Sequence, residues 1–221
     1  MMNPAGKNLV CFALEDEARA FRKLAAGRND VDILLTGIGQ KSAERAVREY
    51  LRANSPKQVF TCGFAGGLDS QLQIGDVVFL TVDWLLDKQL VQAGAKPGSF
   101  YCAPRVAVTA LEKSRLREQT GASAVEMESV AIHTVCIELG FFCATVRVIS
   151  DTVHEDMPLD FNALANPDQS LSYGKLALAI AKSPGKIPAL LRLQRNCKFA
   201  AERLANVLLK VIEADLPPLE H

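Results

Sequence analysis

The sequence predicts an α/β fold, a three-layer α/β/α domain around a central, largely parallel mixed sheet. Short apolar runs with strand character alternate with helical segments along most of the chain, the order that produces parallel sheets. The 221 residues are 49% hydrophobic and 23% charged, which is enough to bury a core without disulfides or metals. No repeat or linker interrupts the pattern, so we expect residues 1–221 to form a single domain.

The N-terminal part of the chain predicts strands that are separated by two helices. Apolar residues at helical spacing, among them Ala43, Val47 and Leu51, define the second of these helices. In chain order we expect a strand at 7–14, a helix at 15–25, a strand at 31–35, a helix at 42–53, and strands at 58–62 and 76–82.

The C-terminal part is less regular at first. Residues 83–104 show poor periodicity and contain Gly94, Pro97, Gly98 and Pro104, which predicts mainly loop. Beyond them we expect a short strand at 105–109, helices at 111–119 and 128–139, a strand at 142–149, and two helices at 172–182 and 187–214. Gly140 is expected to end the helix at 128–139.

The composition excludes several classes of function. Lys and Arg together number 25, as do Asp and Glu, and a net charge of zero argues against a dedicated nucleic-acid binder. No apolar run approaches the ~20 residues of a membrane span. Acidic residues 15–17 follow the N-terminal apolar run at once, unlike a signal peptide, so we expect a cytoplasmic protein. The six cysteines lack metal-binding spacing and are expected to be buried, reduced thiols, and no metal site is expected.

Positive charge is concentrated near the C-terminal end. Residues 172–212 contain eight basic side chains and one acidic side chain, Glu202, whereas the rest of the chain is acidic. Apolar residues of the last helix recur every three or four positions and form one face: Leu190, Leu193, Cys197, Ala200, Leu204, Leu208 and Val211. Either this helix packs on the domain with its charges solvated, or its basic face makes peripheral contact with an anionic membrane.

Acidic or glycine-rich residues lie at the ends of four predicted strands, at 15–17, 37–39, 63–67 and 150–151. Ligands bind beyond the carboxyl ends of the strands in open α/β sheets, so this coincidence predicts a ligand site at one edge of the sheet. Each segment alone also has a purely structural interpretation. Acidic residues stabilise the positive end of a helix, glycines form tight turns, and Asp151 is either a cap or a catalytic acid.

Residues 37–42 match a dinucleotide-binding fingerprint only in part. Ser42 occupies the place of its third glycine or alanine, and Phe60 and Thr61 stand where the next strand should end in a ribose-binding acid. The phosphate-binding pattern GxxxxGK[ST] is absent from the sequence. We therefore expect no cofactor.

Six segments in order resemble the purine nucleoside phosphorylase and nucleosidase superfamily, and within it the methylthioadenosine/S-adenosylhomocysteine nucleosidases. They are ALEDE at 13–17, TGIG at 36–39, GFAGGL at 63–68, IGDVV at 74–78, AVEMES at 124–129 and VRVISD at 146–151. The chain is most similar to the hopanoid-associated phosphorylase-like branch, in EAR at 17–19, GFAGGLD at 63–69, ALEK at 110–113 and PGKIPALLRL at 184–193. The resemblance implies a nucleoside phosphorylase-like fold and cleavage of the N-glycosidic bond of a purine nucleoside, with adenine as the expected base.

The resemblance also implies a role for each matching residue. Asp151 would protonate the departing base, and Glu17 would orient and deprotonate the attacking water. Glu128 would hold the ribose hydroxyls, with Met127 packed against the sugar. Other residues implied to bind substrate or to orient the loop of the acid are Glu126, Ile38, Phe64, Ala65, Gly66, Val106, Arg147, Ser150 and Phe161. Carboxylates beside the sugar would stabilise the positive charge of an oxocarbenium-like transition state.

Several alternatives stay open. Attack by water would make the enzyme a nucleosidase, whereas phosphate recruited by Arg19 would make it a phosphorylase. Residues 102–106 lack the base-stacking aromatic of the nucleosidases, so a catalytically weakened nucleoside-binding protein is the alternative outside the enzymes. The resemblance implies a homodimer. In the hopanoid-associated branch it also implies a lipid-linked nucleoside substrate such as adenosylhopane.

Overall fold

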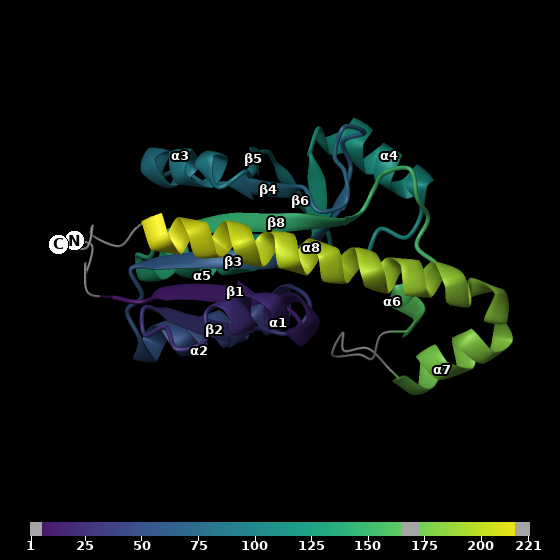
Figure 1. Cartoon of the computed structure of the whole chain (residues 1–221), viewed down its shortest axis with the longest axis horizontal. Helices are drawn as coiled ribbons and strands as arrows, with labels where there is room; N and C mark the ends of the chain where they lie inside the picture. The colour runs from purple at the N-terminus through teal and green to yellow at the C-terminus, as the bar shows by residue number, and fades with distance from the viewer. Residues whose placement is uncertain (1–5, 165–172, 215–221) are drawn as a thin grey trace.

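The computed structural model describes residues 6–164 and 173–214 and confirms the three-layer α/β/α architecture (Figure 1). Within these residues the mixed sheet contains eight strands, in the order β2-β1-β3-β8-β4-β5, with β7 paired to β3 and β6 paired to β7. Their bounds are β1 (Asn8–Phe12), β2 (Val31–Leu35), β3 (Gln58–Gly67), β4 (Val77–Leu80), β5 (Lys96–Pro97), β6 (Phe100–Cys102), β7 (Ala124–Glu126) and β8 (Cys143–Asp151). Strands β2, β1, β3 and β8 run parallel, whereas β4 is antiparallel to β8 and β7 to β3.

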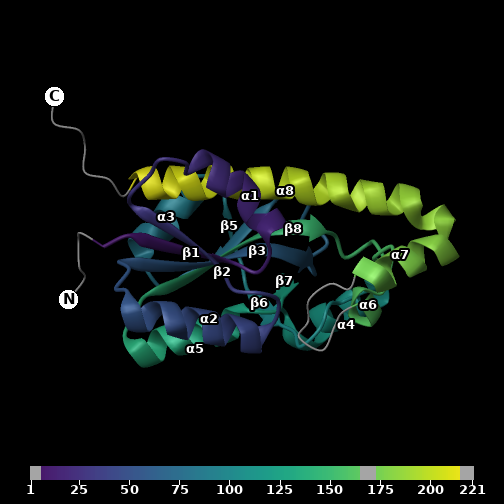
Figure 2. The same cartoon turned by 90° about the horizontal axis from the view of Figure 1, so that it is seen from below.

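Helices cover both faces of the sheet (Figure 2). α1, α3 and α8 lie over one face, and α2 and α5 pack together on the other. The described helices are α1 (Glu15–Leu24), α2 (Gln40–Ala53), α3 (Trp84–Gln92), α4 (Ala110–Thr120), α5 (Ser129–Leu139), α6 (Phe161–Leu164), α7 (Tyr173–Lys182) and α8 (Ile187–Ala214), with a 3₁₀ turn at Pro184–Lys186. Among the described residues four apolar clusters result, and the two largest contain Phe21 and Leu204, and Val47 and Ile132, respectively.

Local sequence accounts for most element boundaries. β2 and α8 begin and end where the periodicity predicts, and most other predicted elements are correct to within two residues at each end. Gly140 adopts a left-handed conformation with φ of 79° and ends α5, as expected. The first residue of the predicted helix at 172–182 lies outside the described residues.

The predicted loop at 83–104 is wrong, because it contains α3 and two short strands, β5 and β6. The side chain of Asp83 accepts hydrogen bonds from the backbone N–H groups of Leu85 and Leu86 at 2.8 and 3.1 Å, which caps the first turn of α3. The glycines and prolines that argue against regular structure begin only at Gly94. They therefore follow α3 instead of interrupting it.

The predicted strand at 105–109 is also wrong. The backbone of Val106 pairs with the side chain of Asn162, whose Oδ1 accepts from the Val106 N–H at 2.9 Å and whose Nδ2 donates to the Val106 carbonyl at 3.0 Å. This residue therefore meets a side chain of α6 instead of a neighbouring strand. Both α6 and β7, which the periodicity does not predict, are only three or four residues long.

β3 continues for five residues beyond its predicted end. Gly63–Gly67, expected to form a turn after the strand, instead pairs with β8 along one side, and its last two residues pair with β7. The register between β3 and β8 shifts at Ala65 and Gly66, where Ile149 and then Asp151 stand opposite, so Ser150 occupies a bulge. The glycine-rich segment is therefore one wall of the predicted site and not a loop above it.

α8 is buried over only part of its length. Ala200, Leu204, Leu208 and Val211 are buried as predicted, whereas Leu190, Leu193 and Cys197 are half-buried. The first turns of α8 and the whole of α7 project past the sheet (Figures 1 and 2). Within the described ranges no helix is long and apolar enough to cross a membrane. All six cysteines, each of them described, are unpaired, and three of the thiols are buried: Cys11, Cys62 and Cys136.

Candidate active site

Arg147 on β8 is the centre of a buried charge cluster. Its guanidinium donates to the Cys62 carbonyl and to Thr61 Oγ1, both at 3.1 Å, and both partners lie on β3. Arg147 Nη2 lies 2.7 Å from Glu126 Oε2 and 3.3 Å from Glu128 Oε2. The side chain of Arg147 is only 1% exposed, so these ion pairs form away from solvent and are weakly screened. Arg147 therefore pairs with Glu126 and Glu128, and none of its described hydrogen bonds and ion pairs is with Asp151.

Glu126 ends β7 and has its acceptor positions occupied by the protein. Its Oε1 accepts from Ser129 Oγ at 2.6 Å, and its Oε2 accepts from the backbone N–H groups of Glu128 and Ser129 at 3.0 and 2.8 Å. Burial alone would raise the pKa of Glu126, but Arg147 and these hydrogen bonds outweigh burial and lower it below its ordinary value. Glu126 is thus an ionised partner that holds Arg147 in place.

Glu128 precedes α5 and reaches across to the turn before α2. Its Oε1 accepts from the Gly39 N–H at 2.9 Å, and Gly39 has a φ of 81°, a conformation that favours glycine. Burial raises the pKa of Glu128 although Arg147 acts in the opposite direction. The glycine turn at 37–39 therefore binds the Glu128 carboxylate through a backbone amide, with Ile38 half-buried beside it.

Glu17 lies in the first turn of α1, beyond the carboxyl end of β1. Its two oxygens accept hydrogen bonds from the backbone N–H groups of Leu14 and Phe64, at 2.9 and 2.8 Å. Burial raises the pKa of Glu17 to about 7, which the nearby Arg147 and these two hydrogen bonds only partly offset. A carboxylate whose pKa is close to neutrality is suited to accept a proton from water.

Gly63 allows Glu17 and Arg147 to approach β3. A Cβ atom at this position would lie 2.5 Å from Glu17 Oε1 and 2.8 Å from Arg147 Nη1. Its φ of 139° also disfavours any other residue. The glycine-rich pattern at 63–67 therefore reflects close packing of charged side chains against the strand.

Asp151 ends β8 and lies beside Gly66, three residues along β3 from Gly63, which is about 10 Å of extended chain. Ser150 Oγ donates to Asp151 Oδ1 at 2.7 Å, an arrangement that the bulge at Ser150 permits. Asp151 is 7% exposed. β3 thus separates and positions the two carboxyl groups that were predicted to act as acid and base.

Lys113 is a site residue that the sequence does not reveal. It is the buried residue of α4, and its ammonium lies 2.5 Å from Asp151 Oδ2. The periodicity of α4 is weak and lysine is normally a surface residue, and the ALEK match at 110–113 implies no role for Lys113 at the site. Only the fold places it next to the end of β8.

The segment that carries Val106 is joined to α6, which begins at Phe161. Asn162, which follows Phe161 in α6, binds the backbone of Val106 through both atoms of its amide. Phe161 and Val106 are each half-buried. Of the other residues implied to bind substrate, Phe64, Gly66 and Met127 are half-buried and Ala65 is buried.

Arg19 differs from the other predicted site residues because it is exposed to solvent. Its side chain is 71% exposed and pairs with Asp16, one turn earlier in α1, at 2.8 Å. Its described contacts do not include the carboxylates of the cluster. Its position therefore gives little support to a phosphate site at Arg19.

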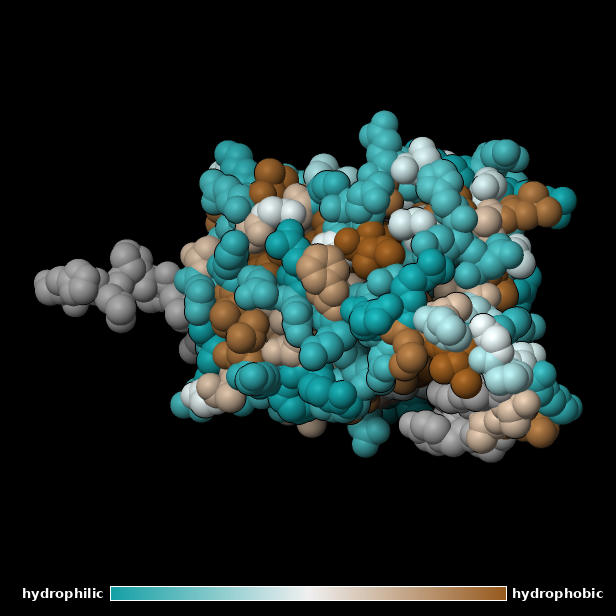
Figure 3. Space-filling model, turned by 45° about the vertical axis from the view of Figure 1, so that its right-hand side comes forward, coloured by the Kyte–Doolittle hydropathy of each residue, from teal (hydrophilic) through white to brown (hydrophobic). Residues whose placement is uncertain are grey.

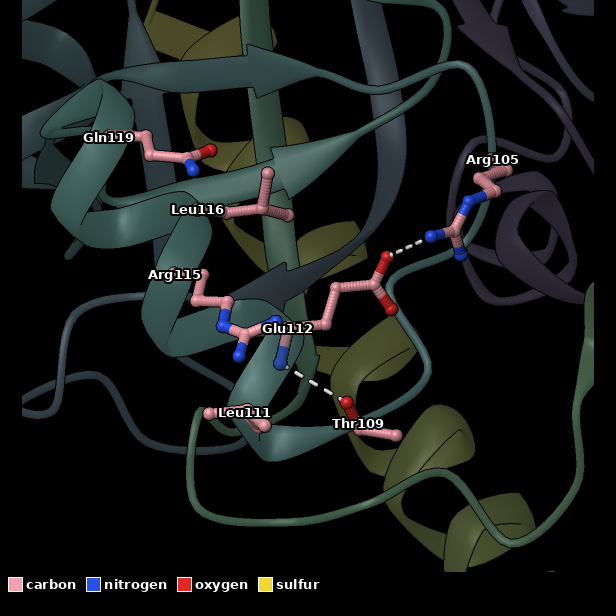
Figure 4. Close-up of a pocket in the computed structure, with 7 residues that line it drawn as sticks. All are labelled: Arg105, Thr109, Leu111, Glu112, Arg115, Leu116 and Gln119. Carbon is pink, nitrogen blue, oxygen red and sulfur yellow. Dashed lines mark hydrogen bonds and ion pairs between the residues drawn. The ribbon is translucent and has the colours of Figure 1, made fainter.

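A surface cavity of about 310 Å³ lies on α4 (Figure 4). Arg105 and Glu112 form an ion pair of 2.5 Å across it, and the Glu112 N–H donates to Thr109 Oγ1 at 3.1 Å. Its lining contains none of the predicted site residues: Arg105, Thr109, Leu111, Glu112, Arg115, Leu116 and Gln119. The cavity on α4 is therefore separate from the buried carboxylate cluster along β3.

Comparison with known proteins gives a consistent result. A family model described as the phosphorylase superfamily matches residues 14–82 and 82–172. A 5′-methylthioadenosine/S-adenosylhomocysteine nucleosidase of Shewanella oneidensis is 28% identical over 169 residues, which cover 61% of this chain and 72% of that protein. The enzyme of the same name from Glaesserella parasuis is 26% identical over 167 residues, covering 60% of this chain and 73% of that protein.

Solved structures share the fold. The futalosine hydrolase of Helicobacter pylori matches with a TM-score of 0.71 and 16% identity, covering 95% of this chain and 98% of that one. The 5′-methylthioadenosine/S-adenosylhomocysteine nucleosidase of Neisseria meningitidis matches with a TM-score of 0.70 and 20% identity, covering 95% and 99%. At these identities the likeness establishes the fold alone.

Proposed function

Since the chain belongs to the phosphorylase superfamily, we propose that it is an enzyme that cleaves the N-glycosidic bond of a purine nucleoside by attack of water. The observation that carries this proposal is the placement of Glu17 and Asp151 along one glycine-rich strand, next to the buried pair of Glu128 and Arg147. The names of the sequence relatives, which are nucleosidases, support the same class of reaction.

In the proposed reaction, water attacks C1′ of the sugar while the bond from C1′ to the base breaks. The electrons of that bond pass to the base, and Asp151 donates a proton to a ring nitrogen so that a neutral base departs. Glu17 accepts a proton from the attacking water. The sugar becomes positively charged in the transition state, and the buried carboxylates of Glu17 and Glu128 stabilise that charge.

Other residues orient these groups. We assign Glu128 to the ribose hydroxyls, with Met127 against the sugar, because its Oε1 has only one described hydrogen bond, from Gly39. Glu126, whose oxygens are occupied by Ser129, Glu128 and Arg147, positions Arg147 and does not need to touch the substrate.

The base is proposed to be adenine, enclosed by Val106 and Phe161. Asn162 ties the segment that carries Val106 to α6, so the two half-buried apolar side chains form one boundary of the site. Ile38, Phe64, Ala65 and Gly66 would supply the remaining wall. The methylthioadenosine in the names of the sequence relatives supports an adenine nucleoside.

The identity of the products tests this function directly. Purified protein incubated with adenosine and 5′-methylthioadenosine should release adenine at the same rate with and without inorganic phosphate, and the other product should be the free sugar. Chromatography of the base and mass spectrometry of the sugar are the measurements. A sugar 1-phosphate formed only with phosphate would make the enzyme a phosphorylase, and Arg19→Ala should then lower its rate. If calorimetry shows nucleoside binding but no base is released, the protein is a nucleoside-binding protein and not an enzyme.

We further propose that the substrate carries an apolar group at its 5′ side, as adenosylhopane does, and that α7 and α8 bring the enzyme to an anionic membrane. Figure 3 turns this end forward and shows apolar side chains among hydrophilic ones. Leu178, Ile187 and Leu191 are 42–56% exposed there. Exposed basic residues of the same segment are Lys182, Lys186, Arg192, Arg195 and Lys198. A basic side chain near an anionic bilayer contributes about 1 kcal/mol to binding.

Sedimentation with vesicles tests the membrane contact. The protein should sediment with vesicles that contain phosphatidylserine at low salt, and it should be released as salt is raised, because the attraction is screened. A variant with Lys182, Lys186 and Arg195 changed to Gln should stay in solution, whereas changing the exposed lysine Lys88 of α3 should have no effect. Failure of the wild-type protein to sediment at low salt would restrict α8 to a structural role.

We also propose that the enzyme works in the cytoplasm as a single-domain homodimer. Unpaired cysteines fit a reducing compartment. Val130, Ile137 and Phe142, on and next to α5, are at least half exposed and offer an apolar surface to a second copy. The solution mass is therefore measured before the vesicle experiment, because a dimer presents two basic ends to the membrane.

A further inference from the structure

Lys113 and Asp151 form a buried ion pair. Lys113 Nζ lies 2.5 Å from Asp151 Oδ2 and donates to the carbonyls of Thr152 and Glu155 at 2.8 and 3.0 Å. Three acceptors around one nitrogen match the three N–H groups of an ammonium, whereas a neutral amine has only two. The Lys113 side chain is 0% exposed, so its positive charge lies directly against the end of β8. Its partner Asp151 is therefore a carboxylate and carries no proton.

The other groups that face Asp151 also favour its ionised form or leave it unchanged. Ser150 Oγ donates to Asp151 Oδ1 at 2.7 Å, so each carboxyl oxygen accepts a hydrogen bond. Cys197 approaches from α8, and burial, followed by the charge of Asp151, raises the pKa of its thiol to about 12, which keeps the thiol neutral. A Cβ atom at Gly66 would lie 3.2 Å from Asp151 Oδ2, so glycine leaves the space that the carboxylate occupies.

The remaining charged groups nearby have partners or face solvent. In the segment after β8, His154 is exposed, and Glu155 Oε1 lies 3.9 Å from Arg192 Nη2 on α8. Glu17 accepts from the Phe64 backbone on β3 and belongs to the cluster around Arg147. Among residues 6–164 and 173–214, Lys113 is the one cation that pairs with Asp151. The ion pair with Lys113 therefore sets the protonation state of Asp151.

An ionised Asp151 and the base of a nucleoside cannot face each other directly. A carboxylate has only acceptor atoms, and the ring nitrogen to be protonated is an acceptor as well. Two acceptors that face each other in a buried site lose their hydrogen bonds to water and gain none in return. One proton between them removes this penalty, because it lets Asp151 donate to the ring nitrogen. A proton must therefore enter the site together with the nucleoside.

We propose that Lys113 is a positioning residue that keeps Asp151 ionised until a nucleoside binds, so that binding takes up one proton from solvent. This inference rests on the proposed function. The proton forms an O–H bond with Asp151, and no bond of the nucleoside breaks at this step. When the glycosidic bond breaks, the proton passes to the base, and Asp151 returns to its ion pair with Lys113. Glu17 releases to solvent the proton that it accepted from water, so the cycle neither gains nor loses protons.

Calorimetry with the Glu17→Gln variant tests the proposal, because this variant should bind 5′-methylthioadenosine without hydrolysing it and has no carboxyl group at position 17 to titrate. The heat of binding is measured at about pH 8 in buffers of different ionisation enthalpy, and its slope against that enthalpy gives the number of protons taken up. About one proton should be taken up per nucleoside. The association constant should accordingly fall about tenfold per pH unit between about pH 7 and 9.

Variants of Lys113 connect this proton to the ion pair. With Lys113→Met added to Glu17→Gln, uptake should fall below about 0.3 proton, because a buried carboxyl group that has lost its ammonium partner holds a proton before binding. Lys113→Arg keeps the positive charge and should keep uptake near one. Arg115→Met removes an exposed charge from the same helix and should leave uptake unchanged.

A second measurement does not depend on the folding of the Lys113 variants, which circular dichroism monitors. Asp151→Asn in the Glu17→Gln background should still bind the nucleoside, but its amide cannot take up a proton. Uptake should therefore disappear, and the affinity should change by less than about twofold over the same pH range.

The outcomes separate the two proposals. No adenine release by wild type, together with no nucleoside binding by Glu17→Gln, would refute the proposed function itself. Nucleoside binding by Glu17→Gln without proton uptake would overturn the role of Lys113 alone. So would uptake that persists after Lys113→Met or Asp151→Asn, because the proton would then go to another group, such as the buried carboxyl of Glu128.

Discussion

Replacing Asp151 with asparagine is expected to lower kcat for purine release by about 10²–10⁴-fold while leaving nucleoside binding largely intact. Asparagine has nearly the same shape, and its amide oxygen can still accept a hydrogen bond from Lys113 or from Ser150, the present partners of Asp151. It has no acidic proton to give to the base. The loss should therefore fall on kcat, and steady-state kinetics with calorimetric binding to the inactive protein measures both parts.

Asp156→Asn is the matched control for this prediction. Asp156 lies on the same segment after β8, is exposed, and caps α4 through Ala110 without touching the carboxylate cluster. Its replacement should leave kcat near the wild-type value. Asp151→Asn activity within a factor of two of wild type would remove Asp151 from the mechanism.

Replacing Glu17 with glutamine should also abolish hydrolysis, with a loss of at least about 10²-fold in kcat/KM. The glutamine oxygen can keep one of the two backbone hydrogen bonds, from Leu14 or from Phe64, but an amide cannot accept a proton from water. Glu15→Gln is the matched control. Glu15 lies at the same helix start, but it is exposed and pairs with Arg22, so its replacement should have little effect.

The pH dependence provides an independent signature of Glu17. Burial raises its pKa to about 7, and only the ionised form can act as a base. As pH falls through about 7 the carboxylate becomes protonated, so wild-type kcat/KM should decrease from neutral toward acid pH. The residual activity of Glu17→Gln should lack this limb. A wild-type profile that is flat between about pH 5.5 and 8 would exclude Glu17 as the base.

Local sequence determines a large part of this protein. Alternating apolar runs and helical periodicity set the bounds of β2 and α8 and the position of most other elements, because these signals depend on residues close together in the chain. They also locate Glu17 and Asp151 at strand ends, since acidic residues directly after a buried run are visible without a structure. The six family motifs occur in chain order at these same segments. Local sequence therefore also predicts the three-layer fold.

Tertiary structure decides which of these residues work together. β3 extends through five residues that look like a turn, because β8 and β7 supply hydrogen-bond partners from more than 50 residues away in the sequence. The same long-range packing buries Lys113 against Asp151 and joins Asn162 to Val106. Neither contact has a local signal, because each combines an ordinary surface residue type with a partner distant in the chain. Burial raises the pKa of Glu17 and removes the Lys113 side chain from solvent. It arises only when the helices pack on the sheet around β3.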